Sequence, residues 1–147
     1  MTTAITFSRQ NWSWFTRTTL WKKNLVLAIG PSLKKVSFIL IKFSYCRFFT
    51  LKHSPCSYVF DGENGVLAHA FFPESGHVHF DDHETFTDGV STGKNLFSVA
   101  LHEIGHLLGL KHSVNSDAIM HGTYKPYNQN MTLTDDERLG IDVIYGK

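Results

Sequence analysis

The chain contains 147 residues, of which 42% are hydrophobic, and its formal net charge is +1. This length accommodates a single packed domain, and a charge so close to zero gives no indication of a nucleic-acid partner. The charged residues are divided unevenly, because no Asp or Glu precedes Asp61, whereas nine of the 14 Lys and Arg do. We therefore expect two segments of different character that meet near residue 60.

The beginning of the chain shows no clear secretory signal peptide. Residues 1–24 are rich in Thr, Ser, Trp and Arg, contain no acidic residue and lack a long apolar core, a composition that is also typical of a transit peptide. The next apolar run, residues 25–29, ends at Gly30. A membrane span requires about 20 apolar residues, so we expect none here.

The rest of the acid-free segment gives weak structural signals. Local patterns predict a strand at residues 25–29 and a short helix at 32–43. Residues 43–56 are too few for the several strands that would complete a sheet, and we expect no strand there. The chain has two cysteines, Cys46 and Cys56, which permit at most one disulfide.

From residue 57 onward the sequence has the pattern of a folded domain. The apolar run 66–72 predicts a strand that is bounded by Pro73, and residues 76–80 predict a second short strand. An acidic stretch, residues 81–84, follows at once. Carboxylates and turn carbonyls are the oxygen donors that calcium prefers, although a stretch of this kind is also typical of a solvated surface loop.

The most informative motif is His102-Glu103-x-x-His106-x-x-Gly109-x-x-His112. On a helix His102 and His106 lie one turn apart on one face, so both imidazoles can reach one metal ion with Glu103 beside them. Gly109 can adopt the left-handed conformation that ends a helix and returns His112 as a third ligand. Three protein ligands and an open fourth position are typical of a catalytic zinc site, with Glu103 as the general base.

Two helices are expected in the second half of the chain. The first begins near residue 96, and apolar residues at helical spacing predict its buried side: Leu96, Ala100, Ile104 and Leu107. A capping box formed by Thr134 and Glu137 indicates the start of the second helix. Its expected contribution to the core is an apolar stripe of Leu139, Val143 and Ile144.

The zinc motif is the signature of the metzincins, and Ser113 with the run 118–120 resembles the matrix metalloproteinase branch of that group. The resemblance is continuous over residues 57–147, which we interpret as part of a catalytic domain. It is poor over residues 1–56, where only 21–43 faintly resembles the family's first strand and helix. It implies an α+β fold, in which a small twisted sheet with an incomplete N-terminal part packs against the zinc helix and a C-terminal helix.

The resemblance also implies a calcium site. Its ligands would be the side chains of Asp61, Asp81 and Glu84 and the backbone carbonyls of Gly62, Asn64 and Val66. Three carboxylates around one small volume would repel one another without a cation. The cofactors expected for this chain are therefore Zn²⁺ and Ca²⁺.

A second, structural zinc site of the family is only partly matched. His69 and His79 correspond to two of its four ligands, whereas the remaining histidine and aspartate fall at Ser54 and Cys56. Tetrahedral zinc requires four donors. The site is therefore either incomplete or completed by other side chains, which would be Cys56 together with His53 or His77.

The function that the resemblance implies is a monomeric, extracellular zinc endopeptidase that cleaves matrix or other secreted proteins. The substrate would lie along the strand that contains Ala68 and Ala70, and Tyr124 would line the main specificity pocket, where Gly122 replaces a usual proline. Met120 matches the methionine that forms an apolar floor beneath the three histidines. The alternative is a zinc-binding fragment without activity, in which the acid-free first half is unrelated sequence such as translated intron.

Overall fold

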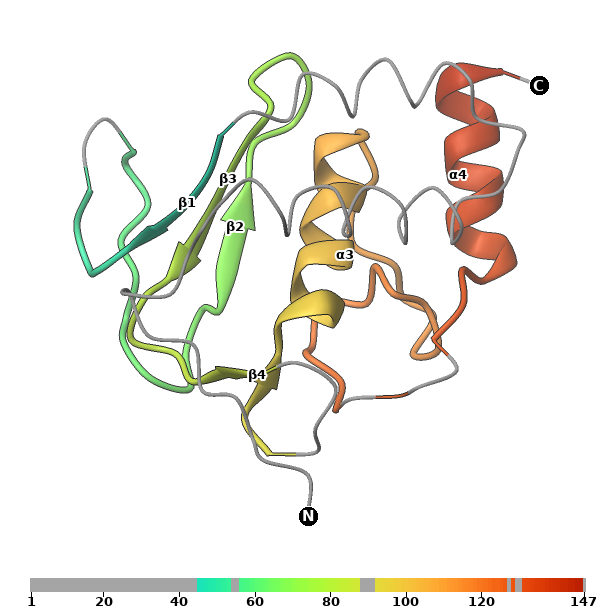
Figure 1. Ribbon diagram of the computed structural model, residues 1–147. Coiled ribbons are helices and arrows are strands. Elements are labelled where there is room, and N and C mark those ends of the chain that lie inside the picture. The colour runs from blue at the N-terminus through green and yellow to red at the C-terminus, as the bar shows by residue number, and fades with distance from the viewer. Residues whose placement is uncertain (1–44, 54–55, 88–91, 127, 129–130, 147) are drawn as a thin grey trace, which may run out of the picture.

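The computed structural model describes residues 45–53, 56–87, 92–126, 128 and 131–146, so the strand and helix predicted within 25–43 lie outside the described residues. It is a small α+β structure, as the sequence predicts, in which helix α3 lies between a sheet and helix α4 (Figure 1). Neither of these two described helices is long and apolar enough to cross a membrane. The elements are β1 (Tyr45–Phe49), β2 (Ala68–Ala70), β3 (His77–Asp81), β4 (Phe86–Thr87), β5 (Lys94–Asn95), α3 (Leu96–Leu107) and α4 (Asp135–Tyr145).

Three strands form the main sheet in the order β1-β3-β2. β1 runs parallel to β3, and β2 runs antiparallel to it. The strand register places Phe48, Phe80 and Ala68 in one row on the face that packs against α3. Since side chains alternate between the two faces of a strand, the adjacent row, which contains His79 and His69, belongs to the opposite face.

The expectation that residues 43–56 contain no strand is wrong, because β1 occupies residues 45–49. The segment is too short for several strands but long enough for this one. Phe48 packs into the apolar cluster and its ring stacks on that of Phe80 at a centroid distance of 5.1 Å, whereas Arg47 is exposed. The alternation of apolar and charged residues that a half-buried strand requires is thus present in YCRFF.

Helix α3 begins and is buried largely as predicted. Asn95 caps it, because the Asn95 side-chain oxygen accepts a hydrogen bond of 2.8 Å from the backbone N–H of Ser98. Of the four residues predicted to be buried, Leu96, Ala100 and Leu107 are buried on the sheet side and Ile104 is half-buried between two apolar clusters. On its other side α3 packs against α4 through Leu101, Leu108 and Ile141.

Helix α4 buries a different face from the predicted one. The expected core residues Leu139, Val143 and Ile144 are 60%, 85% and 45% exposed. The buried positions are Glu137 and Ile141, which are one helical turn apart, and Tyr145 follows one turn later with its hydroxyl donating a hydrogen bond of 2.9 Å to the carbonyl of Leu108. The apolar pattern was misleading because a charged residue, Glu137, belongs to the buried face.

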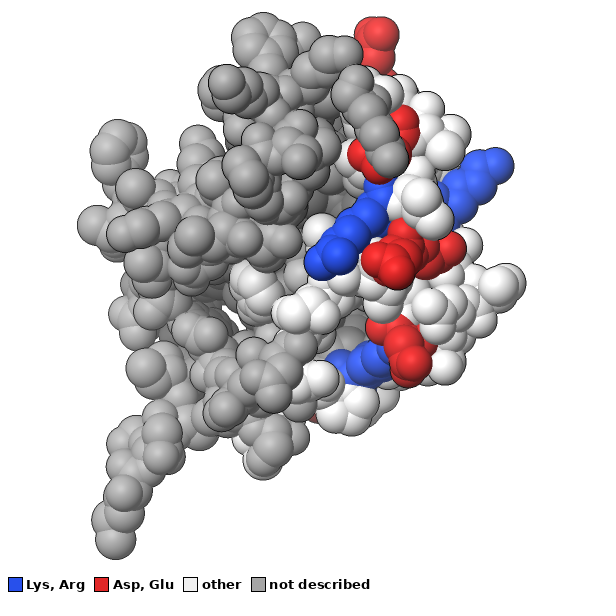
Figure 2. Space-filling view, turned by 90° about the vertical axis from the view of Figure 1, so that its right-hand side faces the viewer, with Lys and Arg blue, Asp and Glu red and all other residues white. Residues whose placement is uncertain are grey.

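The α4 side of the molecule carries charges of both signs. Figure 2 shows Lys and Arg side chains interspersed with Asp and Glu on this face. One pair is an exposed contact of 3.6 Å between Arg138 Nη1 and Asp135 Oδ1. An exposed pair of this kind contributes little to stability. The described residues of this face therefore show no continuous basic surface of the kind that nucleic-acid binding requires.

The burial of α4 predicts unequal effects at two neighbouring apolar positions. Ile141→Ala should lower the free energy of unfolding by about 2–5 kcal/mol, because it leaves a cavity between α4 and α3. Val143→Ala should change it by less than about 0.5 kcal/mol, since Val143 is 85% exposed. Denaturant-induced unfolding of the two variants measures both values, and equal losses would show that this face of α4 is assigned wrongly.

Candidate metal centres and active-site cleft

The three histidines of the zinc motif meet at one point. His102 and His106 project from α3 with ring centroids 4.8 Å apart, and His112 reaches them from the loop after the helix. The Nε2 atoms of His102 and His112 are 3.2 Å apart, and one ring nitrogen from each of the three lies within 4.8 Å of the others. The spacing predicted from the sequence is therefore realised as a convergent group of three donors.

Backbone carbonyls orient two of these rings. His102 Nδ1 donates a hydrogen bond of 2.8 Å to the carbonyl of Ile119, and His106 Nδ1 donates one of 2.8 Å to the carbonyl of Leu110. A neutral imidazole that carries its proton on Nδ1 leaves the Nε2 lone pair free for a metal. Burial and the neighbouring histidines lower the pKa of His102 to about 4, so this ring is neutral at physiological pH.

The turn after α3 depends on Gly109, whose φ of +92° is the left-handed conformation predicted for it. Its N–H donates to the carbonyl of His106 at 2.9 Å, and the N–H of Leu110 donates to the carbonyl of Gly105 at 2.9 Å. These two bonds form a Schellman motif, which satisfies the carbonyls at the end of the helix. The same turn presents the Leu110 carbonyl to His106 and returns the chain toward His112.

Met120 is 2% exposed and packs against α3 at Gly105, next to His106 in the sequence. The packing requires glycine at position 105, because a Cβ there would overlap the sulfur of Met120. Gly105 is therefore a site residue that the sequence analysis missed. The signal for it was a glycine inside a helix, which is unfavourable by about 1 kcal/mol unless packing or function requires it.

The sequence analysis also missed the second role of Glu137. Its Oε2 accepts a hydrogen bond of 2.7 Å from the N–H of Thr134, as the predicted capping box requires. Its Oε1 accepts one of 3.0 Å from the backbone N–H of Met120, 17 residues earlier in the chain. One carboxylate, 2% exposed, thus joins the start of α4 to the floor of the histidine site.

Glu103, the predicted general base, is buried on α3 and lines the same cleft as the three histidines. Its side chain is 5% exposed, and its Oε2 is buried without a hydrogen-bond partner in the described part of the structure. Burial raises the pKa of this carboxyl to about 8. With this pKa the carboxyl holds its proton at neutral pH, whereas a cation bound nearby would favour the carboxylate, the form that accepts a proton.

The histidines and Glu103 line a cleft of about 950 Å³. One wall is the β2 region with Ala68 and Ala70, and the opposite wall is the segment 117–126. Tyr124 lines this wall, and its hydroxyl accepts a hydrogen bond of 2.8 Å from the backbone N–H of Asn95 at the start of α3. The three residues predicted to contact a substrate therefore border one cleft.

A second group of donors lies on the face of the sheet away from α3. It combines His53, Cys56, His69 and His79, whose ligand atoms all lie within 4.8 Å of one another. Of the two histidines considered for this site, the structure brings His53 and not His77 into the group. Ser54 lies outside the described residues. The disulfide that the sequence permitted is not formed, because both cysteines are free.

The predicted calcium ligands are brought together only in part. Asp81 is fully buried, and its carboxylate accepts hydrogen bonds from the N–H groups of Gly62 (3.2 Å) and His83 (2.9 Å). The Asp61 carboxylate instead accepts from Val66 within its own loop at 2.7 Å. The three carboxylates are not among the groups of described residues whose donor atoms all lie within 4.8 Å.

Glu84 is a buried acid of this region, and its carboxyl group is only partly hydrogen-bonded. Its side chain is 7% exposed, and its Oε1 is buried without a hydrogen-bond partner among the described residues. Burial and the charge of Asp81 raise the pKa of Glu84, although the backbone N–H groups of Asn64 and Gly65 and the charge of Lys94 oppose this. The loop at 61–66 and the stretch 81–84 are thus in contact through buried carboxylates.

The sequence profile of the matrixin family matches residues 19–146, which include both donor groups and the cleft. The chain belongs to the matrixin family. The match begins well inside residues 1–56, the part in which the sequence analysis found little resemblance. The α+β architecture described above is consistent with a matrixin catalytic domain.

Individual relatives align with the second part of this matrixin. The hatching enzyme of Paracentrotus lividus is 53% identical over 87 residues, which are 59% of this chain and 15% of the relative. Human matrix metalloproteinase-19 is 49% identical over 94 residues, which are 64% of this chain and 18% of the relative. Human matrilysin is 46% identical over 95 residues, which are 62% of this chain and 36% of the relative. The chain thus spans well under half the length of these relatives.

The hydrogen bond between Glu137 and the backbone of Met120 predicts that substitution of Glu137 lowers stability by more than the loss of one negative charge does. Glu137→Gln should lower the free energy of unfolding by about 1–3 kcal/mol, since one of two buried N–H groups loses its acceptor. Asp136→Asn is the matched control, because it removes the same charge from an exposed position in the same helical turn. Urea unfolding compares the two, and equal effects would mean that the Met120 contact contributes nothing.

Proposed function

We propose that this matrixin is a zinc-dependent endopeptidase. The observation that carries the proposal is the position of Glu103, a buried carboxyl with a free oxygen, beside three imidazoles at the wall of a cleft. A structural zinc site has no use for such a carboxyl or for an open fourth position. His102, His106 and His112 are the proposed ligands of the catalytic metal.

The donor set fits zinc. Two of the three imidazoles donate a hydrogen bond from Nδ1 to a backbone carbonyl, and zinc-binding histidines usually donate their other ring N–H in this way. Neutral imidazoles suit zinc among the common divalent metals, although copper or nickel also bind them. When bound, the metal supplies Lewis-acid stabilisation for the negative charge that develops on the scissile carbonyl.

The chain's own groups provide the proton transfers. Glu103 accepts a proton from the attacking water as the carbon–oxygen bond forms, and it then delivers this proton to the nitrogen of the departing amine. The surrounding apolar packing keeps the carboxyl out of bulk water and fixes its direction. The Ile119 carbonyl orients the His102 ring, and Met120 next to it packs against α3 at Gly105, which holds this segment against the helix that carries Glu103.

The proposed substrate is an extended peptide along β2. This strand is the last in the described sheet order, and Ala68 and Ala70 face the cleft with small side chains. Backbone pairing at a strand edge gives affinity with little demand on sequence. Tyr124 lines the opposite wall, and Gly122 leaves this wall without a side chain beside His112. Matrix or other secreted proteins are the proposed targets, outside the cell.

Substitution of Glu103 tests the mechanism. Glu103→Gln should leave zinc bound but lower the rate of cleavage by about 10²–10⁴-fold, the usual contribution of a general acid–base group. Zinc content and turnover of a fluorogenic peptide are measured on the same preparation. Near-normal turnover in Glu103→Gln would remove the assigned role. A zinc-loaded wild-type chain that cleaves nothing would favour the alternative, a non-catalytic zinc-binding fragment.

Calcium is the second proposed cofactor, bound between the loop at 61–66 and the stretch 81–84. The buried carboxyl oxygen of Glu84 without a partner supports this, as does the fully buried carboxylate of Asp81, because a cation would stabilise both charges. A cation here would tie together the two segments that flank β2 and β3. Asp61 would have to turn from Val66 toward the cation to complete the site.

A calcium titration of the zinc-saturated protein tests this proposal. Ca²⁺ at a hundredfold excess over Kd should stabilise the folded state by about 2.7 kcal/mol, visible as a higher melting temperature. Glu84→Gln should largely abolish the increase. Glu63→Gln, an exposed position in the partner loop, should retain it. A wild-type melting temperature that is indifferent to Ca²⁺ would mean that this region is only a solvated acidic surface.

A further inference from the structure

The second donor group is built by the register of the sheet. β2 and β3 pair antiparallel with His69 directly opposite His79, so both imidazoles lie on the face away from α3. The chain after β1 brings His53 and Cys56 to the same face, against the two strands. Two residues of one loop and one residue from each of two strands therefore converge, although they are up to 26 positions apart in the chain.

The separations of the four donor atoms approach those of a tetrahedral metal site. His79 Nδ1 lies 2.9 Å from His53 Nε2 and 3.1 Å from His69 Nε2, and Cys56 Sγ lies 3.3 Å from His69 Nε2. For zinc bonds of about 2.0–2.1 Å to nitrogen and about 2.3 Å to sulfur, a tetrahedron requires about 3.3 Å between nitrogens and about 3.5 Å between nitrogen and sulfur. These three separations are slightly shorter than the tetrahedral values, and every other pair of donors lies within 4.8 Å, so the group is close to the size that the ion requires.

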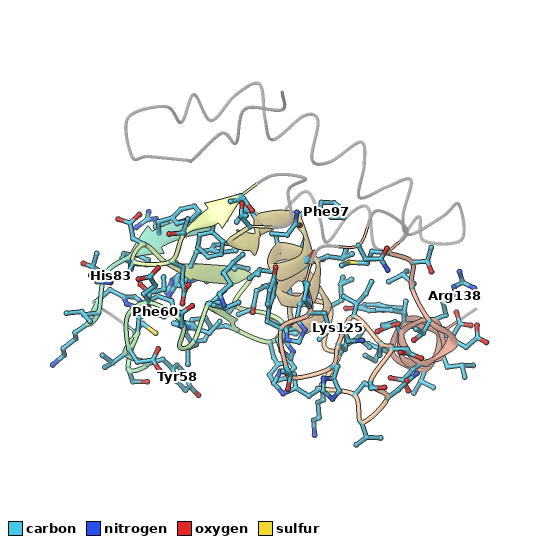
Figure 3. The ribbon with its side chains drawn as sticks, turned by 90° about the horizontal axis from the view of Figure 1, so that it is seen from below. Tyr58, Phe60, His83, Phe97, Lys125 and Arg138 are labelled. Carbon is cyan, nitrogen blue, oxygen red and sulfur yellow. The ribbon has the colours of Figure 1, made fainter. Side chains whose placement is uncertain are left out.

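The surroundings hold these donors in place. His53 Nδ1 donates a hydrogen bond of 3.1 Å to the carbonyl of Leu51, which leaves its Nε2 lone pair directed into the group. The His53 ring lies between the rings of Phe49 and Phe60, with centroids at 4.3 Å and 5.2 Å. Phe60 is 1% exposed and also stacks on His69 at 4.8 Å. Tyr58 and Phe60 lie on the sheet side of the molecule, away from α4 (Figure 3).

We propose that His53, Cys56, His69 and His79 bind a zinc ion through three imidazoles and one thiolate, and that oxidation of Cys56 releases this metal. In the family pattern an aspartate occupies the place of Cys56. The thiolate therefore distinguishes this centre from that pattern. A carboxylate oxygen is inert to oxidants, whereas a thiolate is not. The substitution therefore adds a redox response to a site whose role is structural.

The chemical step requires a hydroperoxide as oxidant. The Cys56 sulfur attacks one oxygen of hydrogen peroxide, a sulfur–oxygen bond forms, the oxygen–oxygen bond breaks and hydroxide leaves. The sulfur loses two electrons to the peroxide and becomes a sulfenic acid. The anionic donor is thereby lost, and the three remaining imidazoles hold the ion less tightly. Release of the ion removes the link that joins His53 and Cys56 to β2 and β3.

The other cysteine is a poor target for the same oxidant. Cys46 packs against the apolar cluster between the sheet and α3, and this burial raises the pKa of its thiol to about 12. The thiolate is the nucleophilic form of cysteine, so Cys46 stays unreactive at neutral pH. Cys56 is also buried, at 8% exposed, but a thiol that coordinates a metal ion is deprotonated, which makes Cys56 the nucleophile of the two. Cys46→Ala is therefore the matched control for substitutions of Cys56.

Cobalt substitution of the full chain tests thiolate ligation without reference to activity. The wild-type protein and Cys46→Ala, each loaded with Co²⁺, should show the near-ultraviolet charge-transfer band of a cobalt–thiolate bond. Cys56→Asp should bind the same amount of Co²⁺ but lack the band, since it restores an oxygen donor. The absence of the band from the wild-type protein, or its persistence in Cys56→Asp, would overturn the assignment.

Peroxide treatment tests the redox response on zinc-loaded protein. Hydrogen peroxide should release about one zinc ion per chain from the wild-type protein and from Cys46→Ala, detected with a chromogenic chelator, and should release none from Cys56→Asp. Full retention of zinc by the wild-type protein, or equal release from Cys56→Asp, would refute the response. The three histidines of the catalytic centre are intact in every variant, so peptide cleavage reports separately on the proposed function.

Discussion

The position of α3 between two apolar clusters is the constraint on which the rest of this structure depends. One side of the helix is buried against the sheet through Leu96, Ala100 and Leu107, and the other is buried against α4 through Leu101 and Leu108. Only a narrow strip between these two faces remains for function, and it carries His102, Glu103 and His106. Burial on both sides prevents the helix from rotating, so that the strip always faces the cleft.

The segments after α3 return to this strip and complete it. The turn at Gly109 supplies a carbonyl to one histidine, and the chain at Ile119 supplies a carbonyl to another. Met120 fills the space that Gly105 leaves open, and Glu137 holds the Met120 backbone in place from the start of α4. Apart from the local bond between His106 and the Leu110 carbonyl, these contacts join residues 15 to 17 positions apart, which explains how a small structure holds the site together.

The two donor groups differ in a way that matches their proposed roles. The group at His102 offers three donors and borders a cleft, so a fourth position stays accessible to water and substrate. The group at His53 offers four donors beneath aromatic rings, so it leaves no position for a substrate. The first is suited to catalysis, and the second is suited to joining residues 50–60 to the strand that borders the cleft.

The sequence by itself determined the features that depend on neighbours one or two turns away. The spacing of the histidines, the conformation of Gly109, the start of α3 and the capping box at Thr134 all follow from local geometry. Tertiary structure decided which face of α4 is buried, that β1 exists, and that His53 rather than His77 joins the second group. These outcomes depend on strand register and on packing between distant segments, and a pattern of adjacent residues contains no information on either.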